Sequence, residues 1–137
     1  MIRSILVMVA ATACGPKPKP RPPDATPRIT ITGNEAFDES TLVPSQMVVT
    51  ISNTYMAGLE RCYAEVLGRD PSARGTVVIV LTVTANGTVA NPKVRAFADL
   101  GGCVESQVRT WSFPIPAGAD GNPTDANFQI TLAFETS

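Results

Sequence analysis

Cysteine is the residue type through which this chain could do chemistry, and it occurs at Cys14, Cys62 and Cys103. The sequence has no histidine, so the commonest general base and the commonest metal ligand are both missing. No Cys-x-x-Cys pair occurs that could begin a zinc site. The pattern therefore favours lipid attachment or disulfide formation over catalysis or metal binding.

The acidic residues do not add a catalytic site. Glu60 and Glu65 are five residues apart on an expected helix, so their carboxylates do not share a tight site. The pair Asp38-Glu39 is typical of a solvated loop. We expect no catalytic constellation, no metal and no cofactor, and hence a protein that is not an enzyme. The net charge of −1 also argues against nucleic-acid binding, which needs a basic surplus to neutralise phosphates.

Residues 1–13 are typical of a secretory signal peptide. Arg3 provides a positive start, residues 5–11 form a short apolar run, and small residues follow it. The run is far shorter than the roughly 20 apolar residues that a membrane-spanning helix needs. We expect this segment to direct export and to be removed.

Cys14 follows those small residues in a pattern that resembles the bacterial lipobox, whose cysteine is lipidated and becomes the first residue. Ala11 stands where that pattern prefers leucine. The alternative is ordinary cleavage after Ala13, which would leave Cys14 as a free thiol. Gly15 replaces the aspartate that retains lipoproteins in the inner membrane. We therefore expect a lipid anchor at the periplasmic face of a bacterial membrane, with the outer membrane favoured.

The odd number of cysteines helps to assign the roles of Cys62 and Cys103. Exported proteins usually pair their thiols, and a leftover cysteine needs an explanation. Lipidation of Cys14 accounts for the odd one and leaves Cys62 and Cys103 to form a disulfide. The alternative is a pair of buried free cysteines.

Residues 14–27 are rich in proline and are expected to link the lipid to the folded part. Proline favours the extended polyproline II conformation, so the linker should be semi-rigid and reach roughly 40 Å. Its basic residues, Lys17, Lys19 and Arg21, either contact anionic lipid head groups or only keep the spacer soluble.

Residues 28–137 alternate between strand and helix patterns and are expected to form one folded domain. The β-rich run at 28–32 precedes an irregular polar stretch at 33–45. Pro44 suits the first turn of a following helix, and Gly68 its end. Apolar residues in this helix recur at steps of three and four, as on one helix face: Val48, Ile51, Tyr55, Leu59, Cys62 and Val66.

The second half of the domain predicts a hairpin, a short helix and a final strand. Residues 76–84 are rich in β-branched side chains, and Asn86-Gly87 predicts a tight turn into a partner strand at 89–97. Pro92 places that partner at a sheet edge or a bulge. A helix fits residues 103–111, and alternating apolar residues predict a half-buried strand at 128–134.

This order of elements predicts an α+β fold, with two helices packed on one face of a mainly antiparallel sheet. A bond between Cys62 on the first helix and Cys103 at the start of the second would then be geometrically reasonable. The opposite face of the sheet would meet solvent or a partner.

Several short motifs together resemble the TonB C-terminal-like domain, and more narrowly its myxobacterial AgmX/PglI C-terminal type. The resemblance covers about residues 43–134. The matching pieces are Cys62-Tyr63, Gly75-Thr76-Val77, Asn86-Gly87-Thr88-Val89, Cys103-Val104 and Trp111-Ser112-Phe113-Pro114. It implies a βαββαβ-like fold and a non-enzymatic role in the cell envelope, in an envelope-spanning, motility or transport complex. TonB itself couples energy to transporters through a spanning helix, which the lipid anchor replaces here.

Two roles are compatible with such a domain. In the first, an exposed sheet edge adds a strand from an envelope protein, with residues 89–97 and 128–134 as the candidate edges. In the second, the chain is a peptidoglycan-associated structural lipoprotein. Sugar binding usually needs exposed flat rings, and we expect Tyr55 and Trp111 to be buried, which leaves only Tyr63. The first role is therefore favoured.

Overall fold

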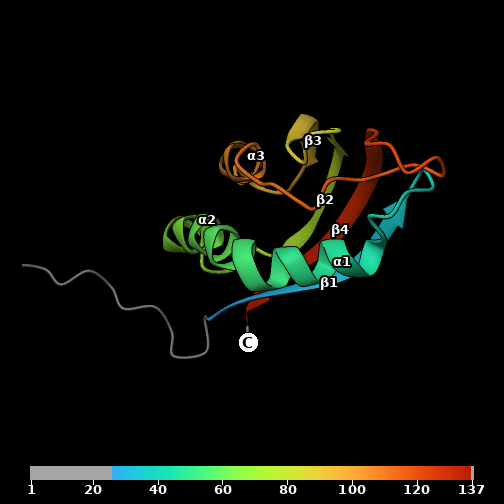
Figure 1. The fold of residues 1–137 in the computed structure, drawn as a ribbon. Helices are drawn as coiled ribbons and strands as arrows, with labels where there is room; N and C mark the ends of the chain where they lie inside the picture. The colour runs from blue at the N-terminus through green and yellow to red at the C-terminus, as the bar shows by residue number, and fades with distance from the viewer. Residues whose placement is uncertain (1–25, 137) are drawn as a thin grey trace, which may run out of the picture.

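The computed structural model describes residues 26–136 and shows an antiparallel four-stranded sheet with its helices on one face (Figure 1). The strands are β1 (Pro27–Ala36), β2 (Gly75–Val83), β3 (Val89–Arg95) and β4 (Ala126–Thr136). They lie in the order β1-β4-β2-β3. The helices are α1 (Pro44–Thr50), α2 (Met56–Arg69) and α3 (Gly101–Val108). The α+β fold expected from the sequence is confirmed.

The two central strands supply most of the sheet's contribution to the core. β2 and β4 pair directly, with Ile79 opposite Ile130. Alternate residues of each strand point toward the helices, because successive side chains of a strand leave opposite faces. The inward residues are fully or almost fully buried: Val77, Ile79, Leu81 and Val83 on β2, and Phe128, Ile130, Leu132 and Phe134 on β4.

A long helical segment covers the sheet and changes its pitch part-way. α1 continues through a π-helical turn, η1 (Ile51–Tyr55), into α2. Residues that face the core recur there every four residues. In an α-helix, four residues rotate about 40° more than one full turn, so the core-facing side would move gradually around the helix. The π-turn has more residues per turn and therefore reduces this rotation. One face can therefore follow the sheet along the whole segment, through Met47, Ile51, Tyr55, Leu59 and Tyr63.

The hairpin between β2 and β3 turns at Asn86-Gly87, as predicted. Gly87 has a φ of 85°, in the left-handed region that favours glycine. Its N–H donates to the carbonyl of Thr84, and its carbonyl accepts from Phe113 N–H, both at 2.8 Å. A Cβ atom at Gly87 would lie 2.6 Å from the Phe113 carbonyl oxygen. The turn therefore needs glycine for its backbone angle and for this close approach.

Several element boundaries differ from the sequence expectation. β1 continues to Ala36 because a bulge after Ile31 lets Gly33 resume pairing with β4, so part of the stretch expected to be irregular is strand. α2 continues past Gly68 to Arg69. α3 spans residues 101–108, and β3 ends at Arg95. Met47, rather than Val48, is the buried residue of α1.

The expected signal peptide, the lipid site Cys14 and nearly all of the proline-rich linker lie outside the described residues. Within residues 26–136, no helix has the length and apolar character needed to cross a bilayer.

Candidate interaction site

The two edge strands of the sheet are β1 and β3. The strand at 89–97 was expected at an edge and is there, as β3. The expectation for 128–134 is wrong, because β4 pairs with β1 on one side and β2 on the other. Alternating burial reports which face of a strand is covered and says nothing about its neighbours within the sheet. β1 is the edge that the sequence pattern did not reveal.

β3 keeps one side free along most of its length, and an isolated bridge between Thr88 and Ser112 lies just before its first residue. Among the described residues, its backbone hydrogen bonds run only to β2. An extra residue in β3 shifts its register against β2, at the position where Asn91 has a φ of 51°. Pro92 lies beside this bulge with its ring buried. Because the regular pairing with β2 is interrupted at the bulge, the missing N–H of proline costs no hydrogen bond there. The segment from Lys93 to Arg95 then pairs regularly again.

A shallow pocket of about 430 Å³ lies beside this edge, on the sheet face opposite the helices. Its floor includes two valines of β2, and its rim carries two cations of β3. The lining residues are Val78, Val80, Lys93, Val94, Arg95 and Gln129. Neither Lys93 nor Arg95 forms an ion pair with another described residue. The pocket therefore combines an apolar floor with uncompensated positive charge next to unpaired strand backbone.

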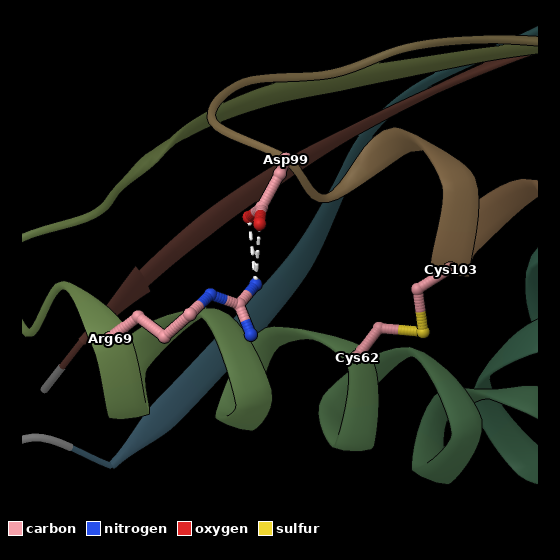
Figure 2. The surroundings of a disulfide bond; sticks show 4 residues. All are labelled: Cys62, Arg69, Asp99 and Cys103. Atoms are coloured by element: carbon pink, nitrogen blue, oxygen red, sulfur yellow. Dashed lines mark hydrogen bonds and ion pairs between the residues drawn. A yellow bond between two sulfur atoms is a disulfide. The ribbon is translucent and has the colours of Figure 1, made fainter.

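The disulfide fixes the helix that supports β3 from the other side. Cys62 of α2 and Cys103 of α3 are bonded, with their Cα atoms 5.7 Å apart (Figure 2). This is the pairing that cysteine parity favours. α3 packs against both α2 and β3, and its buried residues Val104 and Val108 belong to the core. The bond thus holds α3 in place under the edge strand.

Tyr63 corrects the expectation of an exposed tyrosine, since its side chain is fully buried. Its hydroxyl donates to the Ala73 carbonyl at 2.6 Å. Its ring packs edge-on against Phe97 and Phe134, at centroid distances of 6.0 and 5.2 Å. Burial raises the pKa of this phenol above its ordinary value. The signal in the sequence was the step of four from Leu59, which places Tyr63 on the covered face.

The second aromatic cluster is also mostly covered. Trp111 is 2% exposed, as expected, whereas Tyr55 is only half-buried. The two rings stack with their centroids 5.0 Å apart. The Tyr55 hydroxyl accepts from Ser112 N–H at 2.8 Å and donates to its carbonyl at 3.0 Å. This side chain is therefore held by the protein itself.

The acidic residues lie apart from the pocket. Among residues 26–136, no three cysteine or carboxylate side chains gather as a group that could hold a metal. Asp38 accepts from the backbone and side-chain nitrogens of Asn127, at 2.7 and 2.9 Å. Glu60 is exposed on α2, as is Glu65. The pocket beside β3 is therefore the candidate interaction site among the described residues.

No protein-family model, curated protein or solved structure gives a significant match to this chain. The class of the protein therefore rests on its own fold, an α+β domain with a free, positively charged sheet edge. The resemblance to the TonB C-terminal-like domain stays a prediction from the sequence.

Proposed function

We propose that this chain is a non-catalytic cell-envelope lipoprotein whose domain binds an extended segment of a partner protein at β3. The observation that carries the proposal is the juxtaposition of a free strand edge with the pocket formed by Val78, Val80, Lys93 and Arg95. The resemblance to the TonB C-terminal-like domain supports the same role.

Strand addition would use the backbone of β3 for affinity and the pocket for specificity. An added strand takes up unpaired N–H and carbonyl groups, while alternate side chains point to opposite faces of the sheet. Side chains on the outer face would meet the floor at Val78 and Val80 and the rim at Lys93 and Arg95. We therefore expect a partner segment that combines apolar and acidic residues.

The anchor would place this edge at a set distance from a membrane. Cys14 is the proposed lipid site, and residues 15–25 are the spacer that separates it from the described domain. At about 3.1 Å per residue, a polyproline spacer of this length would reach roughly 34 Å. The proposed location is the periplasmic face of a bacterial membrane, with the outer membrane favoured.

Site-specific photo-crosslinking in the native envelope tests the proposed edge. A photoreactive amino acid at position 93 should yield protein adducts, whereas the same group at exposed position 65 of α2 should not. Equal adducts from both positions would contradict the proposal.

Sedimentation with purified peptidoglycan tests the other role. Among the described residues, the tyrosine and tryptophan rings are buried or held by the protein, and Phe37 is the aromatic ring that stays exposed, at 53%. We therefore expect the protein to remain in the supernatant. Co-sedimentation with pure sacculi would overturn the protein-binding role in favour of a peptidoglycan-associated one.

A further inference from the structure

β1 is the second free edge, and the proposed function leaves it unused. Within residues 26–136, its ten residues make backbone hydrogen bonds only to β4. Its outer edge therefore presents unpaired N–H and carbonyl groups along its length, which is a template for another strand.

The bulge in β1 divides its outward-facing residues into two sets. Before the bulge, Arg28 and Thr30 are paired with outward residues of β4. After it, Gly33 and Glu35 take that face, because the extra residue Thr32 reverses the alternation. Even-numbered positions point outward in the first half of the strand and odd-numbered positions in the second.

This reversal restricts how β1 could pair with a second copy of itself. In an antiparallel pair, opposite residues must point to the same face of the sheet. Here an even-numbered residue of the first half must meet an odd-numbered residue of the second. One such register sets Arg28 opposite Glu35 of the second copy, Ile29 opposite Asn34, and Thr30 opposite Gly33.

The charges favour that register. Arg28 and Glu35 are both exposed, and neither forms an ion pair with another described residue. A twofold axis would place each Arg28 opposite the Glu35 of the other copy, which makes two complementary cross-strand pairs. The absent side chain of Gly33 leaves room for Thr30 of the second copy.

We propose that two copies of this chain pair through antiparallel β1 strands, in the register that sets Arg28 against Glu35. The two four-stranded sheets would join into one sheet of eight strands, with a β3 edge at each end. The dimer would thus present two copies of the β3 pocket to its partners. This inference does not depend on what binds at β3.

Sedimentation equilibrium of the full chain carrying Cys14→Ser tests the dimer without any association through a lipid. We expect a reversible dimer whose dissociation constant rises with salt concentration. Arg28→Glu and Glu35→Arg should each weaken the dimer by about tenfold or more, because each replaces two attractive pairs with repulsive ones. The double variant Arg28→Glu/Glu35→Arg should restore association.

Two controls keep the test specific. Lys93→Glu changes a charge on the other edge and should leave the dimer unchanged. Circular dichroism of each variant checks that the fold survives, since Arg28 also lies opposite Glu135 within its own sheet. A protein that stays monomeric at millimolar concentration would overturn the proposal. Failure of the double variant to restore association would also overturn the proposal, and so would a loss of the dimer in Lys93→Glu.

Discussion

The guanidinium of Arg69 on α2 contacts the carboxylate of Asp99, in the loop before α3, with Nη2 at 2.7 Å from Oδ2 and 2.8 Å from Oδ1. The Cys62–Cys103 disulfide joins the same two parts of the fold at a second point (Figure 2). One tie is covalent and the other is an exposed ion pair. They should therefore respond differently to mutation and to pH.

Removal of the disulfide should destabilise the domain strongly. The bond spans 41 residues of sequence, and the chain-entropy model gives about 4 kcal/mol for a loop of this length. We expect the double variant Cys62→Ala/Cys103→Ala to lose about this much free energy of unfolding in urea denaturation. Cys14→Ser, the matched control outside the folded domain, should unfold like the parent. Equal stability of the double variant and the parent would show that the bond contributes nothing.

The ion pair should make stability depend on acid pH. The hydrogen bond from Arg69 lowers the pKa of the Asp99 carboxyl below its ordinary value. The stabilisation is therefore complete above the ordinary carboxyl pKa of about 4 and is lost as the pH falls through the lowered pKa. Arg69→Gln should return the pKa of Asp99 toward its ordinary value in a carboxylate NMR titration. An Asp99 pKa that the substitution leaves unchanged would contradict the assigned cause.

Gly75 and Gly102 should respond in opposite ways to alanine. A Cβ atom at Gly75 would lie 2.8 Å from two ring carbons of Phe97, whereas nothing lies within 4 Å at Gly102. We expect Gly75→Ala to cost about 1–3 kcal/mol through overpacking. Gly102→Ala, in α3, should instead stabilise the domain by about 0.5–1 kcal/mol. Thermal unfolding of the two variants measures both effects, and a stabilised Gly75→Ala would show that the Phe97 ring moves freely.

The mass of the mature protein tests the proposed anchor. We expect a polypeptide that begins at Cys14, carries a covalently attached lipid and is lighter by two hydrogens than its reduced form. Cys14→Ser should release the protein from the membrane fraction. A mature chain with a free Cys14 would show ordinary cleavage after Ala13 and would contradict the proposed lipid anchor.

The local patterns of the sequence predicted most elements of the fold. Asn86-Gly87 located the hairpin, Pro92 marked a bulged edge, and the alternation in 128–134 identified β4. These features depend on neighbouring residues, so a single sequence carries them. The position of β4 between β1 and β2 depends on pairing between distant segments. Apolar and polar residues alternate in the same way in an edge strand and in a central strand, so this pattern could not reveal the neighbours of β4.

The ring partners of Tyr63 and the full length of β1 could not be predicted from the sequence. The step of four from Leu59 indicates that Tyr63 is covered, but its partners Phe97 and Phe134 come from the loop after β3 and from β4. The extension of β1 to Ala36 depends on a bulge that lets a polar, glycine-containing stretch pair with β4. The pocket at β3 likewise needs Gln129 of β4 beside Val80 of β2. Each feature is set by contacts between segments that lie far apart in the sequence.

Peptide titration followed by NMR tests the central claim, that β3 binds an extended acidic and apolar segment. The full chain with Cys14→Ser would be titrated with a peptide of alternating valine and glutamate. We predict that shift changes concentrate in residues 89–95 and at Val78 and Val80. Lys93→Glu/Arg95→Glu should weaken binding by about tenfold, while the exposed pair Arg61→Glu/Arg74→Glu should not. Shift changes centred elsewhere, or equal binding of a valine–lysine peptide, would contradict the account.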